Sequence, residues 1–178
     1  DQGFFLGEHG WYDKRWMYEP SLRTPLIVHW PGVTDAGSTS DLMVQNIDMA
    51  PTFLQMAGMD VPSTMQGESL TPILKGGTPK KWRDAIYYHY QQSDEGRTSH
   101  IVAKHYGIRT QRYKLIYVYE HDFWEFYDLR SDPDETHNLY RDPSQADRIF
   151  EMKDRLAQMR LDLKDKTGPD LPLLETRR

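Results

Sequence analysis

The chain has 178 residues, of which 38% are hydrophobic and 28% charged, with a formal net charge of −5 and no cysteine. Without a basic block it does not suit a nucleic-acid partner, and no apolar run approaches the roughly 18 residues that cross a membrane. The lack of cysteine excludes disulfides and thiolate metal sites.

The first 15 residues combine oxygen donors, glycines and a lysine within a charged triplet. Asp1 and Gln2 bring a carboxylate beside an amide carbonyl, which are the oxygen ligands that calcium prefers. Three glycines in residues 3–10 let the backbone fold tightly beside a ligand. Lys14 then supplies a positive charge for an anionic substrate. We interpret this stretch as part of a site for a metal and an anion.

A metal-binding loop usually lies at the end of a rigid element, and none is predicted ahead of Asp1. We therefore expect these residues to be the C-terminal portion of a longer protein. A mature N-terminus produced by processing is the alternative.

Few regular elements are predicted in the first half of the chain. Residues 1–24 are expected to be a loop, with one helical turn near residues 19–23. The apolar run 25–30, closed by Pro-Gly, predicts a buried strand. Asp48 is the predicted N-cap of a helix that ends at Gly58. A short helix is expected at 71–74, before a Gly-Gly-Thr-Pro boundary signal.

The second half predicts a small antiparallel sheet and a long helix. Segments rich in β-branched and aromatic residues predict its strands at 85–90, 106–110, 113–119 and 123–129. Their aromatic residues alternate as core residues do, which favours packing over sugar stacking. Ser144 is the predicted N-cap of a helix that ends before Gly168-Pro169. Its apolar stripe comprises Ile149, Met152, Leu156, Met159 and Leu163.

Four segments, in order, carry a family resemblance that covers nearly the whole chain. DQGFFLGEHGWYDKR resembles the metal-and-lysine segment of the type I, formylglycine-dependent sulfatases of the alkaline-phosphatase-like superfamily. NIDMAPTFLQMAGMDVP with MQGESLTPIL, HYGIRTQRYKLIYVY, and EFYDLRSDPDETHNL resemble later segments of the same family. The opening Asp-Gln pair and the DKR triplet resemble those of bacterial N-acetylglucosamine-6-sulfatases.

The resemblance implies an α/β fold in two parts. Residues 1–80 would be the closing piece of an alkaline-phosphatase-like mixed-sheet catalytic domain, with an apolar surface exposed where the rest of that domain is missing. Residues 81–178 would be a C-terminal subdomain, a small antiparallel sheet with a C-terminal helix.

The resemblance also implies roles for individual residues. Asp1 and Gln2 would complete a calcium site, and Lys14 would be the catalytic contact to the sulfate group. The family's nucleophile is a formylglycine matured from Cys or Ser in a motif that this chain lacks, so the chain alone would not turn over. Calcium and Lys14 would offset charge on the non-bridging sulfate oxygens.

Three further residues are candidate substrate contacts. Asp13 and Arg15 offer acceptors and a fork of donors that suit sugar hydroxyls, although a solvated charge pair is the alternative. His105 is predicted to reach the same pocket, with a structural histidine as the alternative. Arg109 is predicted to be an internal ion-pair partner, and His9 a hydrogen-bonding residue within its loop.

Sulfate-ester hydrolysis on a glycan or glycosaminoglycan is therefore the favoured function, with a sulfated carbohydrate as the partner. The family habit favours a periplasmic or secreted location. A phosphate or phosphonate monoester hydrolase of the same superfamily is one alternative, although such sites usually hold transition metals in His-rich sets. A non-catalytic carbohydrate-binding module is the other, and it leaves the Asp-Gln pair and Lys14 without a purpose.

Overall fold

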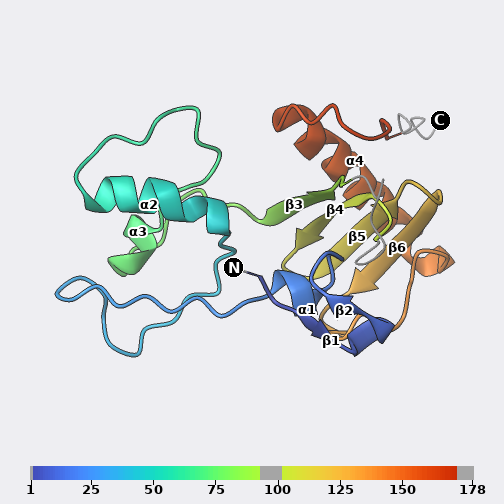
Figure 1. Ribbon diagram of the computed structural model, residues 1–178, viewed down its shortest axis with the longest axis horizontal. Helices are drawn as coiled ribbons and strands as arrows, with labels where there is room; N and C mark the ends of the chain where they lie inside the picture. Colours follow the sequence, from blue (N-terminus) through green and yellow to red (C-terminus); the bar gives the residue numbers. More distant parts are fainter. Residues whose placement is uncertain (1, 93–101, 172–178) are drawn as a thin grey trace. The chain divides into compact units, whose positions relative to one another are not determined.

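The computed structural model describes residues 2–92 and 102–171 (Figure 1). They form two compact units. We call residues 25–84 the helical unit, and residues 2–24 together with those from 85 onward the sheet unit. The predicted division at residue 80 concerns the domains of a longer protein and stays a prediction. No helix in the described residues is long and apolar enough to span a membrane.

The sheet unit is built on a four-stranded antiparallel meander in the order β3-β4-β5-β6. Its strands are β3 (Ala85–Tyr90), β4 (His105–Thr110), β5 (Tyr113–Val118) and β6 (Phe123–Asp128). Only two residues separate β4 from β5, which is the length of a tight hairpin turn. The predicted antiparallel sheet is confirmed.

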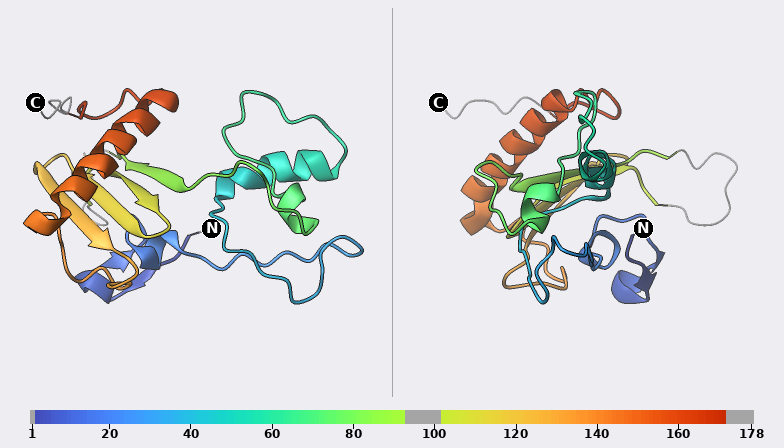
Figure 2. Two further views of the ribbon diagram at one scale, coloured as in Figure 1. Left: turned by 180° about the vertical axis from the view of Figure 1, so that it is seen from behind. Right: turned by 90° about the vertical axis from the view of Figure 1, so that its left-hand side faces the viewer.

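Helix α4 (Ala146–Asp162) covers one face of this sheet (Figure 2). Its residues Ile149, Met152 and Leu156 are buried against strand residues such as Leu115 and Phe126, and Met159 packs beside them, which confirms these four positions of the predicted stripe. The fifth, Leu163, lies just beyond the end of α4. The predicted cap is wrong. Ser144 lies within a 3-10 turn, η3 (Pro143–Gln145), whose cap is Asp142 accepting the Ser144 N–H at 2.9 Å.

Residues 2–24 pack against the opposite face of the sheet. Because side chains alternate along a strand, Leu115 points towards α4 whereas Ile116 points towards Phe5 and Met17. A side chain at Gly107 would collide with the Met17 sulfur, so this glycine admits the close approach. Aromatic strand residues fill the two cores, as predicted; they include Tyr106, Tyr117, Trp124 and Tyr127.

The segment 2–24 has more order than the predicted loop. It contains β1 (Phe5–Leu6) paired antiparallel with β2 (Tyr12–Asp13), a 3-10 turn η1 (Glu8–Gly10), and α1 (Glu19–Leu22). Only α1 corresponds to a predicted element. The two strands are each two residues long, which is too short to leave a pattern in the sequence.

The helical unit contains a 3-10 turn η2 (Asn46–Asp48), then α2 (Met49–Met56) and α3 (Thr71–Leu74). Both predicted helices are confirmed. The predicted role of Asp48 as the side-chain cap of α2 needs correction. Its side chain makes no capping hydrogen bond to α2 and instead accepts the backbone N–H of Gln45, three residues earlier, at 2.8 Å.

The predicted buried strand at 25–30 is wrong for the described residues. They pair with no strand there, and Ile27 is 90% exposed. A lone extended segment gains neither ladder hydrogen bonds nor a covered face, so an apolar run forms a buried strand only where a neighbour supplies both.

Candidate functional site

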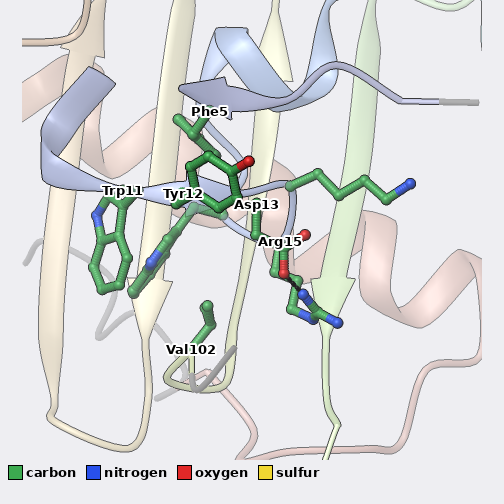
Figure 3. A pocket seen from close by; sticks show the side chains of 8 residues that line it. Phe5, Trp11, Tyr12, Asp13, Arg15 and Val102 are labelled. Atoms are coloured by element: carbon green, nitrogen blue, oxygen red, sulfur yellow. Dashed lines mark ion pairs between the residues drawn. The ribbon is translucent and has the colours of Figure 1, made fainter. Parts of the chain in front are cut away.

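A cavity of about 250 Å³ in the sheet unit brings the predicted triplet together. Its lining residues come almost entirely from one short segment (Figure 3): Phe5, Trp11, Tyr12, Asp13, Lys14, Arg15, Trp16 and Val102. All three members of the DKR triplet therefore border one space, as the sequence predicts.

The backbone at Asp13 is held in a sparsely populated conformation. Its φ is +100°, in the region that favours glycine, while Phe5 pairs with it across the β1–β2 ladder. Such a residue costs on the order of 1–3 kcal/mol and persists only where its surroundings enforce it. The Asp13 side chain is nearly buried and forms an ion pair with Arg15 (Figure 3). The pair presents an acceptor and a donor fork side by side next to Lys14.

Two tryptophans form an aromatic wall of the cavity. Trp11 is partly exposed and its ring lies 5.4 Å from that of Trp16, inclined by 49°. The Trp16 indole N–H is buried and has no hydrogen-bond partner among the described residues. Sequence reasoning missed both residues, although their positions on either side of the DKR triplet were a usable signal.

His105 lies behind this wall and does not line the cavity. It is fully buried, and its ring stacks on Trp16 with centroids 4.5 Å apart. Its Nδ1 lies 2.8 Å from the Ala103 carbonyl oxygen, which can only accept, so Nδ1 donates and Nε2 keeps its lone pair in the neutral ring. That Nε2 has no partner among the described residues. Burial lowers the pKa of His105 to about 4, which keeps the ring neutral at pH 7.

The buried ring predicts a loss of stability in acid. The unfolded chain binds a proton at His105 near pH 6.5, whereas the native state does so only near pH 4. The contribution of neutral His105 to the free energy of unfolding is therefore fully present above pH 6.5, and it falls by up to about 3 kcal/mol as the pH drops to 4. We expect chemical denaturation of a His105→Gln variant to lack this decline. The exposed His29, changed to Gln, serves as the control, and equal pH profiles for both variants would contradict the assignment.

The predicted metal ligands are only partly described. Asp1 lies outside the described residues, and Gln2 is exposed. The Gly3 N–H donates to the Ser21 carbonyl at 2.8 Å, and a side chain at Gly3 would collide with the Pro20 carbonyl, so the backbone after Gln2 is held against α1. The described residues contain no group of three or more His, Cys, Asp or Glu that could hold a metal. A carboxylate and an amide oxygen fit calcium chemically but supply only two of its six to eight oxygen ligands.

One of the two predicted structural roles is confirmed. Arg109 forms a bidentate pair with Glu19, at 3.2 and 3.1 Å, which confirms it as an internal ion-pair partner. His9 adopts a φ of +56° and stacks on Tyr18 with ring centroids 4.3 Å apart. His9 also meets the Phe5 ring edge-on, and its predicted hydrogen bond stays a prediction.

Comparison with known proteins gives a consistent group of relatives. The chain matches the family described as N-sulphoglucosamine sulphohydrolase, C-terminal, over residues 7–162. It is 49% identical over 173 residues to an N-acetylglucosamine-6-O-sulfatase of Bacteroides thetaiotaomicron, covering 96% of this chain and 30% of that protein. The N-acetylglucosamine-6-sulfatase of Homo sapiens is 41% identical over 99 residues, covering 54% of this chain and 17% of that protein.

A solved structure matches with a TM-score of 0.87 and 47% identity, covering 97% of this chain and 35% of that chain. That protein is in complex with its substrate, D-glucosamine-2-N,6-O-disulfate. The chain thus spans only 17–35% of the length of these relatives.

Proposed function

Since the chain belongs to the sulfatases, within the family described as N-sulphoglucosamine sulphohydrolase, C-terminal, we propose that it forms the C-terminal part of a sulfuric ester hydrolase. The proposed reaction of the full-length protein is hydrolysis of a sulfate ester on a carbohydrate. The observation that carries this proposal is the placement of Lys14, Asp13 and Arg15 around one cavity with an aromatic wall. The family also favours a periplasmic or secreted protein.

Lys14 is the proposed catalytic contact to sulfate. A sulfate ester is a monoanion whose non-bridging oxygens repel an incoming oxygen nucleophile, and an ammonium group held beside them reduces that repulsion. The Asp13–Arg15 ion pair balances its own charge. With one acidic and two basic side chains, the triplet carries a net charge of +1.

Asp1 and Gln2 are the proposed calcium ligands of this chain. Calcium, when bound, supplies further positive charge beside the sulfate oxygens. The chain's own contribution is to place an amide oxygen at the start of the segment that also carries Lys14. The formylglycine nucleophile expected of the family would come from outside this chain.

The proposed substrate is 6-sulfated N-acetylglucosamine within a glycan or glycosaminoglycan. Two relatives carry this sugar in their names, and the matching solved structure contains a 6-O-sulfated glucosamine. Asp13 and Arg15 could accept from and donate to hydroxyls of the ring. His105 could accept a sugar hydroxyl at its unpaired Nε2, provided that the Trp16 wall opens.

The proposal is tested by offering the full-length protein a set of esters. We expect release of sulfate from N-acetylglucosamine 6-sulfate, with much slower release from the 3-sulfate and from galactose 6-sulfate. A phosphonate monoester and a phosphate monoester test the related hydrolase activity. Faster turnover of either than of every sulfate ester would overturn the proposal, and so would sugar binding by calorimetry without any turnover.

A further inference from the structure

We propose that an ion network of Glu19, Arg109 and the fully buried Lys114 and Glu135 positions Lys14, acting through Ser21. These four residues are positioning residues, and we call them the anchoring network. The inference rests on the proposed function only in taking Lys14 as the contact to substrate. None of the four lines the cavity.

The anchoring network joins three separate parts of the sheet unit. Lys114 on β5 is fully buried, and its Nζ lies 2.9 Å from Glu19 Oε1 and 2.6 Å from Glu135 Oε1. Arg109 on β4 donates hydrogen bonds to both carboxylate oxygens of Glu19. Glu135 also accepts the Glu19 backbone N–H at 2.6 Å. Glu19, the first residue of α1, is thus held through both its side chain and its backbone.

The charges of the network balance, with two cations against two carboxylates. Burial by itself would raise the pKa of Glu19, but Lys114 and Arg109 outweigh it and lower that pKa to about 2. Burial outweighs the effect of Lys114 on Glu135 and raises the pKa of this carboxyl, and the nearby Glu19 carboxylate raises it further. The contact geometry agrees, because Glu19 receives both cations, with Arg109 on its two oxygens and Lys114 on Oε1.

Stability alone is a poor reason for such a network. Burying ions costs desolvation, and well-packed apolar side chains of similar volume often serve equally well or better. The neighbours of Lys114 along β5, Leu115 and Ile116, are fully buried apolar residues of that kind. A set of directed ion pairs adds a fixed geometry, which apolar packing specifies less sharply.

The short helix α1 connects the anchoring network to the backbone of Lys14. Ser21 lies two residues after Glu19 in α1, is fully buried, and donates its hydroxyl to the Lys14 carbonyl at 2.7 Å. On the next residue, the Tyr88 hydroxyl donates to the Arg15 carbonyl at 2.6 Å. The backbone that carries Lys14 is therefore tied to α1, and α1 is tied to the sheet by the anchoring network.

The experiment uses Ser21→Ala and Glu19→Gln variants of the full-length protein. The matched control is Arg112→Gln, which breaks a bidentate pair with Asp128 on the same sheet, far along the chain from Lys14. We expect kcat for N-acetylglucosamine 6-sulfate to fall at least 10-fold in both variants, with little change in Arg112→Gln. Ser21→Ala leaves the anchoring network intact, so the loss of kcat can still be measured in this variant if Glu19→Gln does not fold.

A double-mutant cycle separates positioning from general damage. If Ser21 acts through Lys14, Ser21→Ala should lower kcat much less in a Lys14→Ala background than in the parent. Equal losses in both backgrounds would overturn the proposal, since the serine would then act independently of Lys14.

Hydrogen exchange makes the inference independent of turnover. We expect the amides of residues 12–16 to exchange at least 10-fold faster in Ser21→Ala and Glu19→Gln than in the parent or in Arg112→Gln. Unchanged exchange would overturn the anchoring network. If the variants exchange faster but the full-length protein hydrolyses no sulfate ester, the anchoring network is supported and the proposed function is rejected.

Discussion

Replacing Lys14 with alanine in the full-length protein should lower kcat for the sulfate ester by about 100- to 1000-fold, or about 3–4 kcal/mol, the scale of a single electrostatic stabiliser. The structure gives a physical reason for so large an effect. Lys14 borders the cavity while its neighbours Asp13 and Arg15 neutralise each other, so no other side chain of the triplet can replace its charge.

Two variants make the Lys14 result specific. The exposed Lys166, changed to alanine, should leave turnover unchanged, because it removes the same charge from a solvated position. Lys14→Arg keeps the charge but widens the head group, so it should recover only part of the lost activity. Unchanged turnover in Lys14→Ala would remove Lys14 from the catalytic set.

The sheet could be predicted because its information is local. Each strand of the meander is six residues long and rich in aromatic and β-branched side chains, and the turns that join β4, β5 and β6 are short. The grouping of Asp13, Lys14 and Arg15 around one site was also predictable, since adjacent residues on a tight segment cannot lie far apart.

Of the anchoring network, the sequence predicted only that Arg109 is an internal ion-pair partner; the pairs themselves could not be predicted, because they join distant parts of the sequence. Lys114 reads as an ordinary solvent-facing lysine in a strand, yet it is fully buried. Its partners lie about 95 residues earlier, at Glu19, and 21 residues later, at Glu135. No periodicity connects them, and only the folded sheet brings the charges together.

His105 shows a prediction that was right in region and inexact in placement. The sequence placed it near the pocket, and the structure puts its ring directly behind Trp16. A single histidine in a strand cannot indicate whether an aromatic residue from another segment stands between it and a cavity. Its role as a substrate contact stays a proposal.

In the helical unit, Asp48→Ala should cost about 3–5 kcal/mol, the scale for leaving a buried charge without its partner. Asp48 is fully buried, and its carboxylate accepts the backbone N–H groups of Gln45 and Glu68 at 2.8 and 2.9 Å. Both of its oxygens also pair with the Arg83 guanidinium. Removing the carboxylate would leave a largely buried cation and two unpaired donors at once.

The loss should spread from Asp48 to the rest of the helical unit. The Asp48 carboxylate accepts the Glu68 N–H, two residues before Leu70, whose own N–H is accepted at 2.8 Å by the Thr52 hydroxyl of α2, so the start of α3 is tied to α2 beside this carboxylate. We expect hydrogen exchange at residues 46–56 and 68–71 of the full-length protein to report the lower opening free energy. The exposed Asp60, changed to alanine, should stay within about 0.5 kcal/mol of the parent. Matching exchange in the two variants would show that the Asp48 contacts do not hold the helical unit together, because Asp48 is buried and paired with Arg83 whereas Asp60 is exposed.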